Sequence, residues 1–394
     1  MTMSQSKAQE SGSRTGRALS AIQEQLDKFC ASIPALAELE AKIAQRTASP
    51  LLDWVDALHL IAEPQRRCKW IELGWLPSAS SPDHEVLRFE GDELPPIVLH
   101  TGLTARLDLR VQSLESFLAT HGLAFNARIQ GSPGSPLRRA AWGQNGLRTF
   151  GVVERRGTFE FDPRRCEALD PARLEHWAQM LRGRARCHSD DAKGLDELGR
   201  VLDQAVAELG EGPVASLFLS TEREYWQWRN QAARIQFRRQ QGLGLGWGNH
   251  GKHIYRCSEE LFEATQALFA KLGFVYKGDD DRQEHVRRLE LAHPFSASRI
   301  VLETYLGELG GSDPHSPGMW TALHGESLMQ AGMHRLCAVQ HRARAGDCVG
   351  EGETWSVDPQ RVRGLLRAGR ISAEVAEELI ERGAAGSELS AKRA

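Results

Sequence analysis

Apolar residues recur at helical spacing near the start of the chain, in its middle and at its end. Three- and four-residue steps predict helices between residues 18 and 62, across 170–240 and near the C-terminus. We therefore expect helical elements at 18–95, 166–246 and 313–394, with a loop at 77–83. The polar residues 1–17 predict a disordered tail. The apolar positions that support the first helices are Ile22, Leu26, Phe29, Ile33, Leu36 and the run from Leu51 to Ile61.

Two other segments, 96–165 and 247–312, contain short strand-like runs around one short helix. Each has the order strand, helix, strand, strand, strand, at roughly 97–160 and 250–306, and the helices end at Gly122 and Gly273. Aligning 137–155 with 286–304 without a gap matches an Arg pair, a Val and a strand-end Glu at one offset of 149 residues. This repeat predicts an α+β fold in which two β-α-β-β-β modules form a curved sheet around a central cavity.

Composition and charge indicate a soluble, reduced protein. Hydrophobic residues make up 41% and the formal net charge is −3, so neither a nucleic-acid nor a membrane partner is expected. The seven cysteines are scattered without a CxxC pair, which argues against a disulfide framework and a structural zinc site. No signal-peptide or membrane-length apolar run is visible, and we expect a cytoplasmic location.

The second module resembles the vicinal oxygen chelate superfamily. The likeness lies in a helix that closes with KLGF and in a following strand, IVLETY, that bears Glu303. Within that superfamily the chain is most similar to the 2-oxoadipate dioxygenase/decarboxylase (hydroxyglutarate synthase) group. Members of that group carry a His-to-Arg strand before an EEL-type helix, here His253 to Arg256 followed by Glu259, Glu260 and Leu261. The resemblance covers the two modules only.

This resemblance implies a divalent metal site with His253 and Glu303 as ligands. The third ligand stays open between His100, Glu154 and His250. Two imidazoles and one carboxylate suit Fe(II), whereas one His with two Glu would also suit Mn, Zn or Ni. A buried carboxylate needs a cation, so the alternative for Glu303 is a structural acid paired with arginine.

The predicted function is a metal-dependent enzyme, namely a non-haem Fe(II) oxygenase or decarboxylase. Its substrate would be a small carboxylate-bearing molecule such as a 2-oxo acid or an amino-acid derivative. Arg256 would bind the carboxylate, Tyr305 would line the pocket, and Glu154 could act as a general base. Two alternatives keep the fold: a metal-dependent isomerase or lyase of the glyoxalase type, and a non-catalytic small-molecule binding protein.

Two further patterns have competing interpretations. In each Arg pair, 138/139 and 287/288, one side chain must point inward on a regular strand. That arginine would either hold a substrate carboxylate or pair with Glu154 or Glu303. The glycine-rich GLGLGWG segment resembles a dinucleotide motif, but it follows a helix and precedes a strand. We therefore expect a flexible entry loop there.

Overall fold

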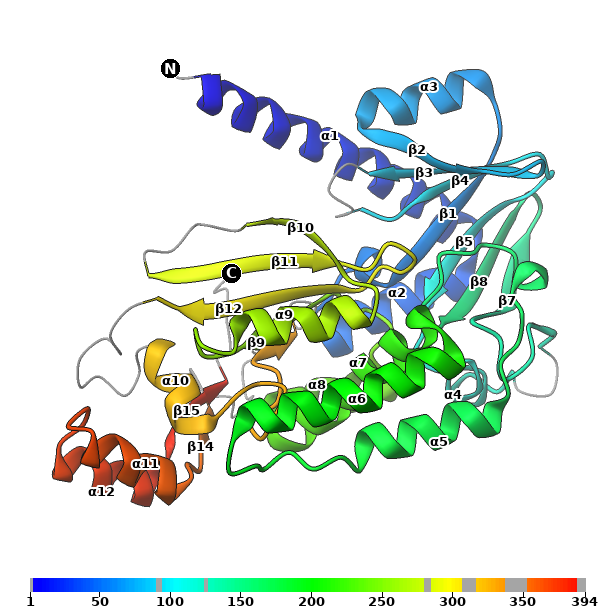
Figure 1. Cartoon of the computed structure of the whole chain (residues 1–394). Helices are drawn as coiled ribbons and strands as arrows, with labels where there is room; N and C mark the ends of the chain where they lie inside the picture. The colour runs from blue at the N-terminus through cyan, green and yellow to red at the C-terminus, as the bar shows by residue number, and fades with distance from the viewer. Residues whose placement is uncertain are drawn as a thin grey trace.

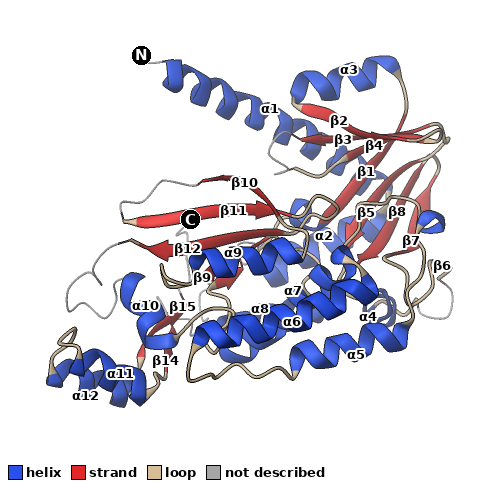
Figure 2. Cartoon of the chain, viewed as in Figure 1, coloured by secondary structure: helices blue, strands red, loops and turns tan. Residues whose placement is uncertain are grey.

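Two mixed β-sheets and the helices around them make up the computed structural model (Figures 1 and 2). The structure describes residues 3–89, 94–123, 127–279, 285–306, 317–336 and 353–387. The strand order is β2-β3-β4-β1-β5-β8-β7-β6 in the first sheet and β10-β11-β12-β9-β13 in the second. The fold is therefore α+β, as predicted.

Three β-α-β-β-β units build these sheets, rather than two. In each unit the first strand pairs in parallel with the last strand, and the other two continue outward in the same order. The first unit is β1 (Val55–Ile61), α3 (Pro64–Leu73), β2 (Trp75–Ser80), β3 (His84–Phe89) and β4 (Ile97–His100). The second is β5 (Ala105–Arg110), α4 (Leu114–Thr120), β6 (Ile129–Gln130), β7 (Leu137–Asn145) and β8 (Arg148–Arg155). The third is β9 (Lys252–Arg256), α9 (Phe262–Lys271), β10 (Val275–Asp279), β11 (Val286–Ala292) and β12 (Arg299–Tyr305).

The first four elements of the first unit lie inside the segment 18–95 that we predicted to be helical, and its last strand, β4, lies in the segment 96–165 that we predicted to be the first module. We predicted a helix across β1 because Leu58 and Ile61 are three residues apart, a spacing that also fits one face of a helix. Strand β2 covers much of the predicted loop 77–83, and it tolerates Pro77 because it is the edge strand of the sheet. The predicted disordered tail also differs, because helix α1 (Met3–Ser32) begins near the N-terminus.

The first and second units join through antiparallel pairing of β1 with β5, which creates the eight-stranded sheet. The third unit does not join them. Its strand β9 pairs instead with the short strand β13 (Arg335–Leu336). The two modules that we predicted to share one sheet therefore belong to different sheets.

Helices cover one face of each sheet. On the first sheet, α1, α2 (Pro34–Thr47), α3 and α4 contribute to one apolar core with the strands. On the second sheet, the core includes α9 and the middle helices. These are α5 (Pro171–Arg182), α6 (Asp191–Leu209), α7 (Glu211–Arg229) and α8 (Gln231–Gln241).

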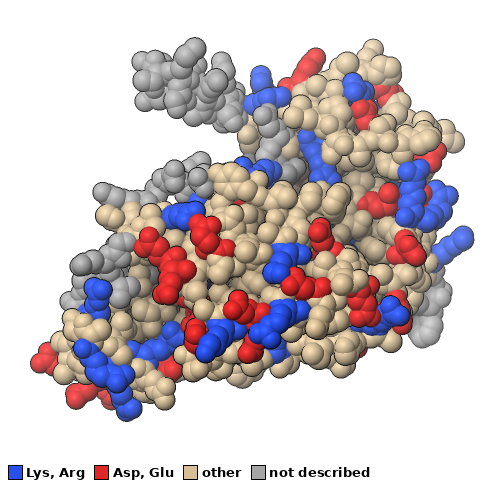
Figure 3. All heavy atoms as spheres, in the orientation of Figure 1, with Lys and Arg blue, Asp and Glu red and all other residues tan. Residues whose placement is uncertain are grey.

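The remaining elements are short turns and a C-terminal group. Two 3-10 turns, η1 (Leu51–Trp54) and η2 (Pro163–Arg165), flank the strands of the first sheet. The C-terminal group comprises α10 (Pro317–His324), β14 (Glu353–Trp355), α11 (Pro359–Arg367), α12 (Ala373–Arg382) and β15 (Ala384–Ser387). No helix in the described part of the chain has both the length and the apolar character needed to cross a bilayer. Acidic and basic side chains are interspersed over α5 and α6 on the face in Figure 3.

Candidate functional site

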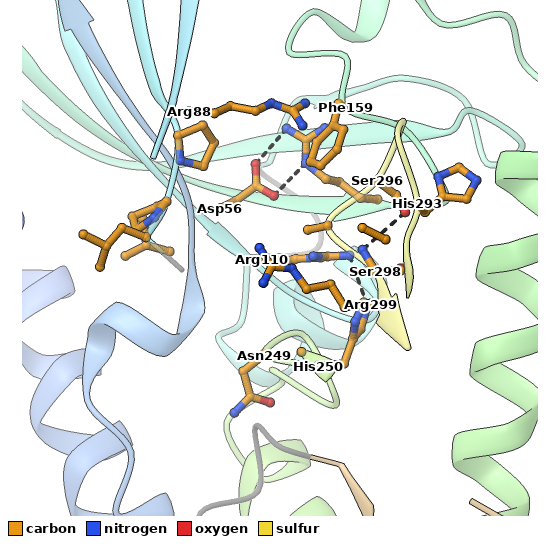
Figure 4. Close-up of a pocket in the computed structure, with 18 of the residues that line it drawn as sticks. Asp56, Arg88, Arg110, Phe159, Asn249, His250, His293, Ser296, Ser298 and Arg299 are labelled. Atoms are coloured by element: carbon orange, nitrogen blue, oxygen red, sulfur yellow. Dashed lines mark hydrogen bonds and ion pairs between the residues drawn. The ribbon is translucent and has the colours of Figure 1, made fainter. Parts of the chain in front are cut away.

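A cavity of about 380 Å³ lies where the first sheet meets the third unit (Figure 4). Its walls come from β1, β3, β5 and β8, from the segment that follows β8, from residues 248–251 and from the loop between β11 and β12. The volume is within the range of small-molecule binding pockets.

The last residue of β5, Arg110, contributes a guanidinium group to this cavity. Its Nη2 donates to Nε2 of His250 at 3.1 Å. No carboxylate of the described residues lies within ion-pair distance of Arg110, and Asp56 attracts it only at longer range. Burial, together with repulsion from Arg155, lowers the pKa of Arg110 to about 10. The guanidinium is therefore charged at neutral pH in a place that disfavours its charge.

A second arginine, Arg223, also has no carboxylate partner among the described residues, and it lies next to the Arg110–His250 pair. Arg223 of α7 is 6% exposed, and its Nη1 donates to Nε2 of His253 at 3.0 Å. The rings of His250 and His253 lie 5.8 Å apart, so the two Arg–His pairs adjoin each other. Burial and the neighbouring Arg110 lower the pKa of Arg223 to about 10.

Both histidines are neutral acceptors in this arrangement. Each uses Nε2 to accept from a guanidinium, so the proton of the neutral ring lies on Nδ1. Burial, followed by the nearby arginines, lowers the pKa of His250 and of His253 well below the ordinary value. The cluster of Arg110, His250, His253 and Arg223, here called the Arg–His cluster, thus carries two positive charges and no compensating carboxylate among the described residues.

A glycine-rich loop fixes His250 against Arg110. A Cβ at Gly248 would lie 2.2 Å from the carbonyl oxygen of Arg110, so only glycine allows this close approach. The loop is also bonded to Gln112, whose N–H donates to Leu245 O and whose side-chain oxygen accepts from Trp247 N–H. The segment that we predicted to be a flexible entry loop is therefore buried and packed on the end of β5.

Two other arginines around the cavity, Arg155 and Arg299, have acidic partners. Arg155 forms two hydrogen bonds to Asp56, of 2.6 and 2.8 Å, and both side chains are buried. Arg299 donates to Glu290 at 3.1 Å, and Lys252 pairs with the same carboxylate. Arg110 differs from Arg155 and Arg299 in this respect.

One more polar group in the cavity wall lacks a partner. Asn249 is 6% exposed, and neither its amide nitrogen nor its amide oxygen has a hydrogen-bond partner among the described residues. A buried amide that forms no hydrogen bond costs stability, and because both amide atoms are fully buried, Asn249 lines the cavity through its other atoms. Asn249 precedes His250 and thus lies beside the Arg–His cluster.

The predicted metal ligands His253 and Glu303 do not come together. In the parallel pair of β9 and β12, His253 is the Cα partner of Ile300, whereas Arg256 is the partner of Glu303. Since side chains alternate between the faces of a sheet, His253 points to the helical face and Glu303 to the opposite face. His253 meets α7 there, and its Nε2 is occupied by Arg223.

Glu303 is a structural acid paired with arginines. Its Oε2 accepts from Arg256 Nε at 3.1 Å, and its Oε1 lies 2.8 Å from Arg288 Nη2. Burial alone would raise the pKa of Glu303, but Arg256, then His334 and Arg288, bring it below the ordinary value. This outcome is the alternative that the sequence left open for the carboxylate. The predicted carboxylate clamp Arg256 is thereby committed to Glu303, and its guanidinium also lies 5.6 Å from the ring of Trp320.

The remaining predicted residues lie at separate places. His100 ends β4 in the first sheet, where its Nδ1 accepts from the N–H of Gly102 at 3.0 Å. Glu154 accepts from the N–H of Leu114 at the start of α4 and pairs with Arg138. Tyr305 does not line the cavity and packs against α10.

The predicted metal centre therefore does not fit the residues present. Its three ligands occupy the first sheet and two opposite faces of the second. Within the described ranges, no group of three or more His, Cys, Asp or Glu side chains could hold a metal ion. His250, the alternative third ligand, accepts from Arg110 instead.

Sequence reasoning missed Arg110 and Asn249. A signal for Arg110 was present, since Arg106, Asp108 and Arg110 alternate with leucines and so share one face of a strand. On that face Asp108 pairs with Arg106 and with His59, which leaves Arg110 as the cation without an acid. Nothing local in the sequence indicated that Asn249 would be buried in a cavity.

No protein-family model matches the chain, and no curated protein matches it. Solved structures do match, among them a glyoxalase I mutant from Zea mays. The alignment has 7% sequence identity and a TM-score of 0.21, and it covers 64% of this chain and 68% of that chain. Because this TM-score is low, we argue the function from the site itself.

Proposed function

We propose that the chain binds a small organic anion in the cavity between its two sheets, with Arg110 as the main binding group. The observation that carries this proposal is the guanidinium of Arg110, which faces the cavity without a carboxylate partner among the described residues. An anion placed there would gain a charge-assisted hydrogen bond and would compensate the charge of the Arg–His cluster.

This proposal keeps the predicted carboxylate-bearing ligand and changes the residues that bind it. The Fe(II) oxygenase or decarboxylase needed His253 and Glu303 on one metal, and these side chains occupy opposite faces. The glyoxalase-type isomerase or lyase needed the same metal, with Glu154 as a general base or fourth ligand, and that carboxylate is engaged by Arg138 and Leu114. The contacts therefore favour the third prediction, a protein that binds a small molecule.

The test compares Arg110→Met with a matched arginine variant on the surface. The probes are hexanoate, 3-phenylpropionate, succinate and inorganic phosphate. The binding of each probe is measured by ligand-observed NMR and by titration calorimetry. At least one probe should bind the wild-type chain and lose about tenfold to a hundredfold in affinity in Arg110→Met, since a hydrogen bond to a charged group contributes about 1.5–3 kcal/mol. Arg173→Met removes a guanidinium from a side chain that is 60% exposed on α5, and it should bind as the wild type does. Equal affinity in Arg110→Met and Arg173→Met would refute the proposal.

A further inference from the structure

The cavity combines its cationic end with an apolar wall. Leu52, Val55, Leu94, Pro95, Phe159 and Val275 are among the residues that line it. A bound molecule that reaches from Arg110 along this wall would bury apolar surface, at roughly 25 cal/mol per Å². A small inorganic anion would leave the wall without a partner.

An aromatic side chain in that wall is held by a cation. The guanidinium carbon of Arg88 lies 3.4 Å from the ring centroid of Phe159, in a cation–π contact. Figure 4 shows Arg88 and Phe159 next to each other at one side of the cavity, with Arg110 further inside. This contact orders the ring, so a ligand would lose little side-chain entropy by packing against it.

The acidic residues of the cavity argue against a second negative charge on the ligand. Asp56 is bound to Arg155, and Asp53 is an exposed carboxylate in the wall with no ion-pair partner among the described residues. Asp53 would repel a dianion more strongly than a monoanion. Arg299 offers little to a second charge because Glu290 already accepts from it.

From these features we infer the ligand class: a monocarboxylate with an apolar, preferably aromatic, body. Its carboxylate binds Arg110, and its body packs against Phe159 and the neighbouring apolar wall. This inference rests on the proposed function, because it assumes that the cavity binds an anion at Arg110. It excludes polyanions such as nucleotides, which would place further negative charge beside Asp53.

The experiment compares four probes on the wild-type chain, on Phe159→Ala and on Trp228→Ala. We expect 3-phenylpropionate and hexanoate to bind more tightly than succinate and inorganic phosphate. Phe159→Ala should weaken 3-phenylpropionate about tenfold, which corresponds to about 1.4 kcal/mol of lost apolar contact. Trp228 of α7 is 74% exposed and does not line the cavity, so Trp228→Ala should leave the affinity unchanged.

The outcomes separate this inference from the proposed function. Tighter binding of succinate or phosphate that still depends on Arg110 would overturn the ligand class and keep the anion site. Absence of binding of both monocarboxylates at millimolar concentration would also overturn the class. If Arg110→Met leaves the affinity of every probe that binds unchanged, the proposed function itself is overturned. A circular dichroism spectrum and a melting curve for each variant verify that a loss of affinity does not come from unfolding.

Discussion

Replacing Arg110 by methionine should make the protein more stable while it removes the binding of anions. The charged guanidinium costs stability in the folded chain because burial lowers its pKa from the ordinary arginine value to about 10. One pKa unit corresponds to 1.36 kcal/mol, so the penalty is roughly 3 kcal/mol at neutral pH. Contact with solvent in the cavity reduces this figure, and the lost hydrogen bond to His250 removes about 1 kcal/mol more. A net gain of about 1 kcal/mol remains.

The sign of the effect follows from the direction of the pKa shift. Arg110 is a base whose pKa is lower in the folded chain than in the unfolded chain. The penalty is therefore fully present below about pH 10, and it disappears only when the unfolded chain also loses the proton. At neutral pH, Arg110→Met should raise the melting temperature by roughly 1–3 °C. Ligand-binding sites often lower the stability of the folded chain in this way, because they hold groups that only the ligand compensates.

Scanning calorimetry of the wild type, Arg110→Met and Arg173→Met at neutral pH tests the prediction. Arg173→Met controls for the loss of a surface guanidinium and should melt with the wild type. A saturating ligand should raise the melting temperature of the wild type and of Arg173→Met, but not that of Arg110→Met. If Arg110→Met melts several degrees below the wild type, Arg110 is a structural residue, and the reasoning from its unpaired charge is refuted.

Two further predictions concern the residues that were expected to bind metal. Glu303→Gln should destabilise the chain by about 3 kcal/mol or more in urea unfolding, because Arg256 and Arg288 lose their shared carboxylate. The metal content of the purified protein should not change, and a loss of metal in this variant would restore the metal hypothesis. The pKa of His253 lies well below 6.5 through burial and then Arg223, so the unfolded chain binds protons first as the pH falls, and stability decreases below about pH 6.5. His253→Gln keeps an acceptor for Arg223 and should show a shallower fall in melting temperature between neutral and mildly acidic pH; an identical slope would contradict this.

The order of the elements in two of the three units could be predicted from the sequence, because local signals mark it. The helices α4 and α9 are followed by Gly122 and Gly273, both at positive φ. In the first unit, α3 is likewise followed by Gly74 at positive φ, but the first strand of the unit was ambiguous. Its strand β1 lies in the middle of the sheet and is apolar nearly throughout, and a short apolar run fits a helix as well as a strand.

The orientation of the strand-end carboxylates could not be predicted, because it depends on one residue of register. The ungapped alignment equated Glu154 with Glu303. In the structure, Glu154 shares the helical face of β8 with Val152, whereas on β12 that face belongs to Leu302. The equivalent positions therefore differ by one residue from the alignment, and a slip of one residue reverses the face of every side chain. The alternation of apolar and polar residues along these strands is similar in both registers, so the sequence alone does not show which residues face the helices.

The same geometry explains why the site lies between the sheets and not within the third unit. On the face of the second sheet opposite its helices, Glu303 joins Arg256 and Arg288 under α10, so both arginines contact a carboxylate and the face is covered. On the corresponding face of the first sheet, Asp108 balances Arg106 but not Arg110, which ends β5. The glycine loop before β9 then places a neutral histidine, and not a carboxylate, against that guanidinium. A chain that evolved only for stability would gain from an acid at this position, so its absence among the described residues is best explained by an anion that arrives from outside.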